Sequence, residues 1–407
     1  MSKRTATRKE TNVPQLRFEG FDDSWEQRKL GDVFKEYSEK NHEELPALTI
    51  IQGGGTILRE ESDRNLQYDK SNLSGYKMVK KDDFIVHLRS FEGGLEKANS
   101  DGIISPAYHT LHGENVDSRF YYPYFRSYEF ISKKLIAHVY GIRDGRSIDV
   151  EGMKTIEIPY TSYEEQKMIG DYLDNLDHLI TLHQHKYERL KTLKQAMLQK
   201  MFPQEGKLVP EIRFEGFTES WEQRKLSDVA DVRDGTHASP KYINIGHPLV
   251  TSKNVKDGFV NYDDIQYISD ADFDEINKRS KVDINDILMG MIGTIGNIAL
   301  IRTEPDFAIK NVALIKDTKQ VNYLYLYHFL QSNRTTKQLT NSMDGGTQKF
   351  IALGNIRNLD IDIPSDEEQV KLGQYFENLD HLITLHQRKY EKLLECKKAF
   401  LAKMFPG

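Results

Sequence analysis

The feature that most constrains this chain is a phrase that occurs in it twice. RFEGFDDSWEQRKL occupies residues 17–30, and RFEGFTESWEQRKL occupies residues 213–226. In a wider window, residues 13–34 match residues 209–230 at 16 of 22 positions, where average residue usage gives about one or two matches by chance. A duplicated phrase at this spacing predicts a duplicated structural unit.

A second repeat ends each unit, and its two copies lie just over two hundred residues apart. IPYTSYEEQ begins at residue 158 and IPSDEEQ begins at residue 363, and LDHLITLHQ occurs at both 176–184 and 379–387. We name the first repeat the box and the second the tail. The bodies between them, residues 35–157 and 231–362, show little resemblance to each other. The predicted plan is a fixed box, a variable body and a fixed tail, twice over.

Each tail predicts a long coiled-coil helix. Its seam positions, alternating in steps of four and three, are Ile169, Leu173, Leu176, Ile180, His183, Tyr187, Leu190, Lys194, Met197 and Met201, and then Leu372, Phe376, Leu379, Ile383, His386, Tyr390, Leu393, Lys397, Phe400 and Met404. This spacing is typical of a coiled-coil seam, and prolines flank each helix. Polar residues at matched seam positions fix the register of a pair; a metal site or switch is the alternative for the histidines.

The bodies predict mixed α/β domains. Strands are expected within 45–60, 81–88, 247–255 and 285–301, and short aromatic-rich helices within 118–135 and 321–333. The predicted domains are the first box and body at 1–160, a spacer helix at 161–204, the second box and body at 205–364, and a second spacer helix at 365–407. The fold class is therefore α/β (mixed α+β) with a pseudo-twofold internal repeat.

Composition restricts the function classes. The 407 residues are enough for two or three domains, and the sequence contains neither a membrane-length apolar run nor a signal peptide, so we expect a cytoplasmic location. The one cysteine, Cys396, excludes an internal disulfide and a cysteine metal cluster. The net charge of −6 does not by itself indicate a nucleic-acid partner.

Catalytic motifs are incomplete wherever they could be tested. GMIGTIG (290–296) lacks the flanking pattern of a dinucleotide site, and the chain has no Walker A loop. PDFAIK (305–310) lacks the second carboxylate of a nuclease, SPAY (105–108) falls short of the two-proline motif of amino-methyltransferases, and DGTH (234–237) contributes one histidine without companion metal ligands. The sequence predicts a chain that is not an enzyme by itself and holds no metal.

Basic residues concentrate in two stretches with glycine turns. The first runs from Arg119 to Arg146 and ends in GIRDGRS (141–147); the second precedes the other tail and contains GGTQK (345–349). Arginine can bond guanine and glutamine can bond adenine in the major groove, while lysine contacts phosphates. A solvated surface without a ligand is the other interpretation of these residues.

Together the box, the tail, and the body phrases GIISPAY (102–108) and DGTHASPKY (234–242) resemble the specificity subunit of type I restriction–modification enzymes. The resemblance covers the chain from Val13 onward. It implies that the bodies are target-recognition domains, each recognising one half of an interrupted DNA sequence. It also implies that the two helices pair antiparallel as a spacer that sets the gap between the half-sites.

The resemblance further implies the partners and the cofactors. The partners would be double-stranded DNA, two methyltransferase subunits and restriction subunits, with no membrane. S-adenosylmethionine, ATP and Mg would be bound by those subunits and none by this chain. The candidate DNA contacts are Lys133, Lys134, Arg143, Arg146, Ser147, Arg89, Thr236, His237, Lys253, Asn254, Thr347, Gln348 and Lys349. Candidate packing or partner residues are Trp25, Trp221, Leu176, Ile180, Leu379 and Ile383.

Two other functions remain open from the sequence. A stand-alone regulator with tandem DNA-binding domains would need no partner, so its repeated box and helix surfaces would have no docking role. A complete methyltransferase with an unrecognised site would transfer methyl groups to DNA without other subunits. The tryptophans, one in each box, are expected to pack where body meets helix, with methyltransferase docking as the alternative.

Overall fold

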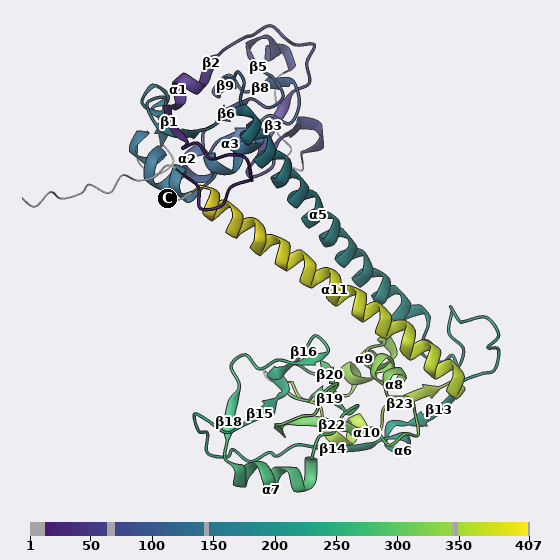
Figure 1. Ribbon diagram of the computed structural model, residues 1–407. Helices are drawn as coiled ribbons and strands as arrows, with labels where there is room; N and C mark the ends of the chain where they lie inside the picture. The colour runs from purple at the N-terminus through teal and green to yellow at the C-terminus, as the bar shows by residue number, and fades with distance from the viewer. Residues whose placement is uncertain (1–12, 63–69, 142–145, 344, 346–348, 406–407) are drawn as a thin grey trace, which may run out of the picture. The chain divides into compact units, whose positions relative to one another are not determined.

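The computed structural model describes residues 13–62, 70–141, 146–343, 345 and 349–405, and these form two compact units. Unit 1 contains the chain up to His183 and from Lys389 onward, and unit 2 contains Gln184–Arg388. Each unit thus combines one body with part of each long helix, α5 (Tyr163–Lys200) and α11 (Asp366–Met404) (Figure 1). The structural division therefore cuts across both predicted spacer helices.

The elements of unit 1 surround a four-stranded antiparallel sheet of order β2-β9-β6-β7. Its strands are β1 Glu26–Lys29, β2 Phe34–Tyr37, β3 Leu48–Ile51, β4 Gly55–Leu58, β5 Lys77–Val79, β6 Phe84–Val86, β7 Glu96–Lys97, β8 Gly102–Ile104, β9 His109–Gly113, β10 Val139–Tyr140, β11 Ser147–Ile148 and β12 Glu157–Tyr160. Its helices before α5 are α1 Leu30–Val33, α2 Ser90–Gly93, α3 Ser118–Phe125 and α4 Val150–Met153, with helical turns η1 Arg59–Glu61, η2 Lys70–Gly75, η3 Glu129–Lys134 and η4 Leu135–His138.

Unit 2 repeats this plan, with a sheet of order β14-β22-β19-β20. Its strands are β13 Glu222–Lys225, β14 Asp231–Asp234, β15 His247–Thr251, β16 Val255–Lys256, β17 Phe259–Val260, β18 Gln266–Ile268, β19 Ile287–Gly290, β20 Ile298–Leu300, β21 Ala308–Lys310, β22 Val312–Lys316 and β23 Asp360–Ile363. Its helices before α11 are α6 Leu226–Val229, α7 Asp270–Ser280, α8 Tyr323–Phe329, α9 Asn333–Asn341 and α10 Leu353–Arg357, with the turn η6 Ser252–Asn254. The strands and helices predicted in both bodies are confirmed.

Each box forms a two-stranded antiparallel sheet with the strand that precedes the long helix, β1 with β12 and β13 with β23. Ile158 lies opposite Arg28, and Ile361 lies opposite the matching Arg224. The sequence alignment of the two IP dipeptides is therefore wrong, because Ile158 corresponds to Ile361 and not to Ile363. The short dipeptide matched by chance, whereas strand register is fixed by which side chains are buried.

The long helices pair through the predicted seam, whose positions are all buried or half-buried. In unit 2, Lys194 forms an ion pair with Asp380 at 2.7 Å, and in unit 1 Lys397 forms an ion pair with the matching Asp177 at 2.5 Å. The partner of Lys194 is Asp380, and the partner of Asp177, which lies earlier in α5, is Lys397, which lies later in α11. This order is antiparallel. Both seam lysines form ion pairs across the helix pair, and their role in fixing its register stays a prediction.

The repeated MFP that ends each tail supplies an aromatic ring to a core. In unit 1 the ring of Phe405 lies 5.9 Å from Trp25 and 5.2 Å from Phe120. In unit 2 the ring of Phe202 lies 5.4 Å from Phe376 and 6.3 Å from Trp221. The end of one helix thereby completes the core around the start of the other. Among the described residues, no helix combines the length and apolar character that crossing a lipid bilayer requires.

Candidate nucleic-acid interface

The candidate interface is supported by a bracket that both units build from the same residues. The glutamate of the EEQ motif at the start of each long helix accepts a two-pronged hydrogen bond from the arginine of the box. Arg17 bonds Glu165 at 2.6 and 2.9 Å, and Arg213 bonds Glu368 at 2.7 Å through both nitrogens. Both carboxylates are buried, where only a paired charge is tolerated. The bracket explains why box and tail repeat together.

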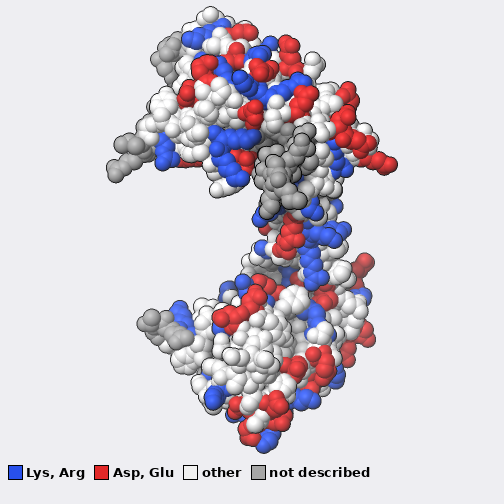
Figure 2. Space-filling model, turned by 60° about the vertical axis from the view of Figure 1, so that its left-hand side comes forward, with Lys and Arg blue, Asp and Glu red and all other residues white. Residues whose placement is uncertain are grey.

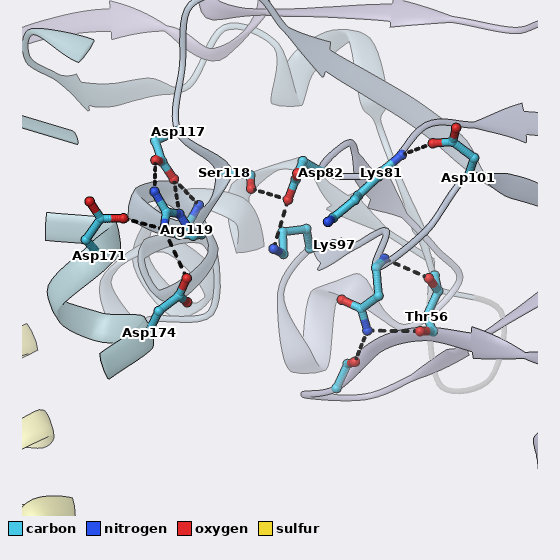
Figure 3. A network of polar contacts seen from close by, with 12 residues as sticks. Thr56, Lys81, Asp82, Lys97, Asp101, Asp117, Ser118, Arg119, Asp171 and Asp174 are labelled. Carbon is cyan, nitrogen blue, oxygen red and sulfur yellow. Dashed lines mark hydrogen bonds and ion pairs between the residues drawn. The ribbon is translucent and has the colours of Figure 1, made fainter. Parts of the chain in front are cut away.

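The glutamine of EEQ attaches the body to the same helix. Its side-chain oxygen accepts from the backbone N–H that precedes the aromatic helix: Asp117 N donates to Gln166 at 3.0 Å, and Asn322 N donates to Gln369 at 2.9 Å. In unit 1, Arg119 on α3 adds bonds to Asp117, Asp171 and Asp174, the last two on α5 (Figure 3). These contacts fix each body on its helix independently of the loops further away.

Both tryptophans are buried at this junction, Trp25 at 5% exposure and Trp221 at 2%. Trp25 Nε1 donates to Glu165 at 3.0 Å. Among the described residues, Trp221 Nε1 has no hydrogen-bond partner. Of the other candidate packing residues, Leu176, Ile180 and Leu379 are buried and Ile383 is half-buried on the helix seam. All six lie where internal packing occupies them.

In unit 2, four loops meet around the hydroxyl of the buried Ser252. Its oxygen accepts from Met291 N at 3.0 Å and Ile292 N at 3.3 Å and donates to Asn311 O at 2.7 Å. Gly293 N reaches Lys349 O at 3.5 Å. Loops that are far apart in sequence are thereby held as one surface at the ends of β14, β15, β19 and β21.

Four predicted contact residues lie on this surface. Thr236 accepts from Asn311 N through its carbonyl at 3.2 Å, and the exposed His237 bonds Asn311 and Asp234, both at 2.8 Å. Lys253 and Lys349 are also exposed, and Lys253 pairs with Asp264 at 2.8 Å. The structure therefore brings Thr236, His237, Lys253 and Lys349 into one loop surface.

Asn254 is a correction to the predicted set. It is 2% exposed, its Oδ1 accepts from the N–H of Thr251 at 3.0 Å and its Nδ2 donates to Asn261 O at 3.1 Å. An asparagine that is buried and bonds its own turn through both ends of the amide is not accessible to a base edge. Its role is to hold η6. Arg143, Thr347 and Gln348 lie outside the described residues.

The corresponding surface of unit 1 is built around α2. Arg89 precedes α2 and is exposed, and the guanidinium of Arg146 lies 5.7 Å from the ring centre of Phe91 on α2. Ser147 follows on β11 and is exposed. Arg89, Arg146 and Ser147 thus come from two segments that meet.

Several residues of the predicted basic stretch of unit 1 have bonding partners within the chain. Lys134 Nζ donates to Glu157 O in the box sheet at 2.7 Å, and burial lowers the pKa of this ammonium. Lys133 is exposed and pairs with Glu129 at 2.7 Å, one turn away on the same helical segment. Arg126 pairs with the buried Glu96. The sequence gives the number of basic residues in this stretch, but it does not show that carboxylates and carbonyls of the same unit already bond them.

Charges of both signs are mixed on the surface, and one group of side chains has the composition of a metal site. On the face shown in Figure 2, Lys and Arg side chains lie among Asp and Glu side chains on both units. Within the part of the chain that the structure describes, one group could ligate a metal: His328, Glu377 and Asp380. Arg302 and Lys194 already pair with its carboxylates, at 3.0 and 2.7 Å. A metal ion would have to displace both.

Comparison with known proteins decides the family. Residues 22–192 and 218–395 each match the family model of the type I restriction modification DNA specificity domain. The chain belongs to this family. One match falls on each copy of the repeat.

Relatives of this specificity-domain chain carry the same description. It is 24% identical over 273 residues to the type I restriction enzyme MjaVIII specificity subunit of Methanocaldococcus jannaschii, covering 64% of each chain. It is 25% identical over 276 residues to the EcoBI specificity subunit of Escherichia coli, covering 61% of this chain and 58% of that protein. The alignments thus span less than two thirds of these relatives.

A crystal structure shows the same fold over nearly the whole length. The type I restriction-modification system S subunit from M. genitalium superposes with a TM-score of 0.62 at 17% identity, covering 97% of this chain and 99% of that one. Two mixed α/β bodies joined by long helices are therefore the family fold, and the predicted fold class is confirmed.

Proposed function

We propose that this chain is the non-catalytic sequence-recognising subunit of a type I restriction–modification complex, with each unit recognising one half of an interrupted DNA target. The observation that carries the proposal is the contrast within each unit. The arginine–glutamate pair and the glutamine contact of EEQ recur in both units, while the candidate contact residues on the loops of the two bodies differ. Two different half-sites require different side chains on a common support.

The spacer role follows from the helix pairing. α5 and α11 have one antiparallel register, set by the two lysine–aspartate ion pairs. A helix rises about 1.5 Å per residue, and DNA rises about 3.4 Å per base pair. The length of the paired helices therefore fixes the number of unspecified base pairs between the half-sites.

The proposed partners are methyltransferase subunits, and their docking surface is supported by exposed leucines. Within the repeated LDHLITLHQ, Leu179 and Leu182 are 40% and 37% exposed, and the matching Leu382 and Leu385 are 39% and 36% exposed. Apolar side chains repeated at the same positions of both helices favour one partner bound twice. We assign S-adenosylmethionine, ATP and Mg to those partners and to restriction subunits.

Co-expression with the cognate methyltransferase tests this proposal. We expect a complex with two methyltransferases per chain, and genome-wide mapping of methylated adenines should then show one bipartite target. Leu179→Glu with Leu382→Glu should prevent assembly, whereas exposed controls Lys186→Glu with Lys389→Glu should not. A lone chain that binds its target tightly as a monomer would favour the stand-alone regulator. Methyl transfer by the purified chain alone would identify it as an enzyme.

A further inference from the structure

Four exposed side chains of different chemistry gather around α2 in unit 1. Leu88 and Arg89 precede α2, and Arg146 lies against Phe91 on α2. The side chain of the exposed Gln52 packs against Gly93 at the end of α2. A Cβ added to Gly93 would stand 2.2 Å from the Gln52 amide nitrogen. An amide, two guanidiniums and an aliphatic group are the side chains that distinguish base edges in the major groove.

Hydrogen bonds to the buried Ser90 stabilise the turn that carries Leu88. His87 N donates to Ser90 Oγ at 2.9 Å, Ser90 N donates back to His87 O at 3.0 Å, and Ser90 is fully buried. At the end of α2, a Cβ on Gly94 would stand 2.1 Å from Phe125 O, so only glycine allows this close approach. The turn is thus closed against α3.

The loop that carries Gln52 is fixed in the same way. The buried carboxylate of Glu96 accepts from Gly53 N at 2.8 Å and Gly55 N at 3.1 Å, and from the Tyr122 hydroxyl at 2.7 Å. A buried carboxylate satisfied by two backbone N–H groups holds a glycine-rich hairpin tip in one conformation. Gln52 and Leu88 therefore project from two segments that are fixed before any ligand arrives.

Leu88 is the unusual member of the set. It is 64% exposed, and single exposed leucines are ordinary on protein surfaces. This leucine, however, stands on a fixed turn between hydrogen-bonding side chains, where covering it would remove an aliphatic group from water without moving the backbone. The matching loop of unit 2, after β19, has the half-buried Ile292 and then Gly293, whose added Cβ would meet nothing within 4 Å.

We propose that Leu88 contacts the 5-methyl group of a thymine in the half-site recognised by unit 1, and that Arg89 and Gln52 bond the edges of neighbouring bases. The 5-methyl group is the one apolar feature of the major groove, and a fixed aliphatic side chain beside an arginine fork and an amide matches it. This inference rests on the proposed function and deepens it. Unit 2 lacks the leucine, so the contact belongs to one half-site alone.

Uracil substitution tests the contact, because uracil differs from thymine by the methyl group only. The probe is a duplex with the mapped target, in which each thymine of both half-sites is replaced by uracil in turn. Binding is measured with the complex of this chain and its methyltransferase subunits. For the wild-type complex we expect about a fourfold loss of affinity at one position, which corresponds to one methyl group removed from water. Leu88→Ala should weaken binding to the thymine duplex and abolish the difference between the two bases.

Two control variants separate this contact from general effects. Leu58→Ala removes another exposed leucine, at the opposite end of the hairpin from Gln52, and should keep the sensitivity to uracil. Arg89→Lys keeps the charge but loses the two-pronged fork, so it should reduce discrimination at the neighbouring base while the salt dependence of binding is preserved.

The outcomes are distinguishable. If Leu88→Ala retains the uracil sensitivity, or no thymine of either half-site is sensitive, the contact is wrong while target recognition stands. Insertion of Leu88 between base pairs would also overturn it, and would appear as a change in 2-aminopurine fluorescence that depends on Leu88 but not on the methyl group. If the wild-type complex does not prefer the mapped target to a scrambled duplex, the proposed function fails first.

Discussion

The two units make the same attachment with different completeness. In unit 1, Glu165 accepts from Arg17, from Trp25 Nε1 and from the Thr161 hydroxyl. In unit 2, Glu368 accepts its side-chain bonds from Arg213, at 2.7 Å. The chain continues through Pro364 where unit 1 has Thr161, and a proline side chain cannot donate. The arginine–glutamate pair is thus the part of the bracket that both copies keep, and the additional donors belong to unit 1.

The largest expected effect breaks the bracket in each unit separately. Glu165→Ala leaves a mostly buried guanidinium, an indole N–H and a hydroxyl without an acceptor, so we expect unit 1 to lose about 3–5 kcal/mol of unfolding free energy. Glu368→Ala leaves only the Arg213 guanidinium without its acceptor, so unit 2 should lose less unfolding free energy, roughly 2–3 kcal/mol. Each unit contains one tryptophan, so urea unfolding followed by fluorescence in Trp221→Phe and Trp25→Phe backgrounds reports the units separately.

Matched controls for this comparison lie one residue away. Glu164 and Glu367 are exposed neighbours of the two buried glutamates, and their replacement by alanine should change stability by less than about 0.5 kcal/mol. Equal losses for Glu165→Ala and Glu368→Ala would mean that the extra donors of unit 1 contribute nothing to the bracket.

A second expected difference depends on pH. Burial raises the pKa of Asp362 to about 6, although Arg334 lies 2.6 Å away. Unit 1 has Pro159 at the same strand position. Between about pH 4 and 6 the folded state holds this proton more tightly than the unfolded chain, so stability is highest below the window and falls as the pH rises through it. Unit 2 should lose roughly 1–3 kcal/mol across that range.

Asp362→Asn should flatten this loss, whatever its effect on absolute stability. The measurement is urea unfolding of unit 2 at pH 4, 5, 6 and 7, followed by Trp221 fluorescence. Asp360→Asn, at a half-buried position two residues away that pairs with Lys225, serves as the control and should keep the pH dependence. An unchanged slope in Asp362→Asn would assign the pH dependence of unit 2 to other groups.

The smallest expected difference concerns the helix seam. Lys194 is mostly buried and bonds both Asp380 and Gln331, whereas Lys397 pairs with the exposed Asp177. Lys194→Ala should destabilise unit 2 by about 1–2 kcal/mol, and Lys397→Ala should destabilise unit 1 by less than about 1 kcal/mol. Thermal unfolding with high salt as a second condition checks this, because only the exposed pair should be weakened by screening.

The sequence predicts the repeated parts of this fold well, because repetition and helical period are local signals. The seam from Ile169 to Met201 follows from spacing alone, because residues three or four positions apart lie on the same face of a helix. The role of Phe202 and Phe405 could not follow from spacing, because each ring enters a core formed around the start of the other helix. Register at Ile158 failed for the same reason: a short dipeptide match carries no information about the opposite strand.

The candidate contact residues show where sequence reasoning ends. Thr236, His237, Lys253 and Lys349, chosen for their residue types and glycine neighbours, lie on one loop surface, and their contact with DNA stays a prediction. Asn254 has the right chemistry but caps a turn, and a single sequence does not distinguish a capping amide from a base-contacting one.

The opposite failure concerns residues that the sequence did not single out. Leu88 and Gln52 carry no sequence signal, because their exposure depends on how Ser90 and Glu96 hold the loops beneath them. A leucine next to an arginine is common in any chain, and only the fixed turn makes it a candidate contact.

The most direct test of the account lengthens the helices and leaves both bodies intact. One heptad is inserted after Gln184 in α5 and one after Arg388 in α11, which adds about 10 Å to the paired helices and keeps the seam continuous. Methylated adenines are then mapped in cells that express this variant with the methyltransferase. The account predicts unchanged half-site sequences separated by about three more base pairs. Altered half-site sequences, or an unchanged gap between the half-sites in an active complex, would contradict it.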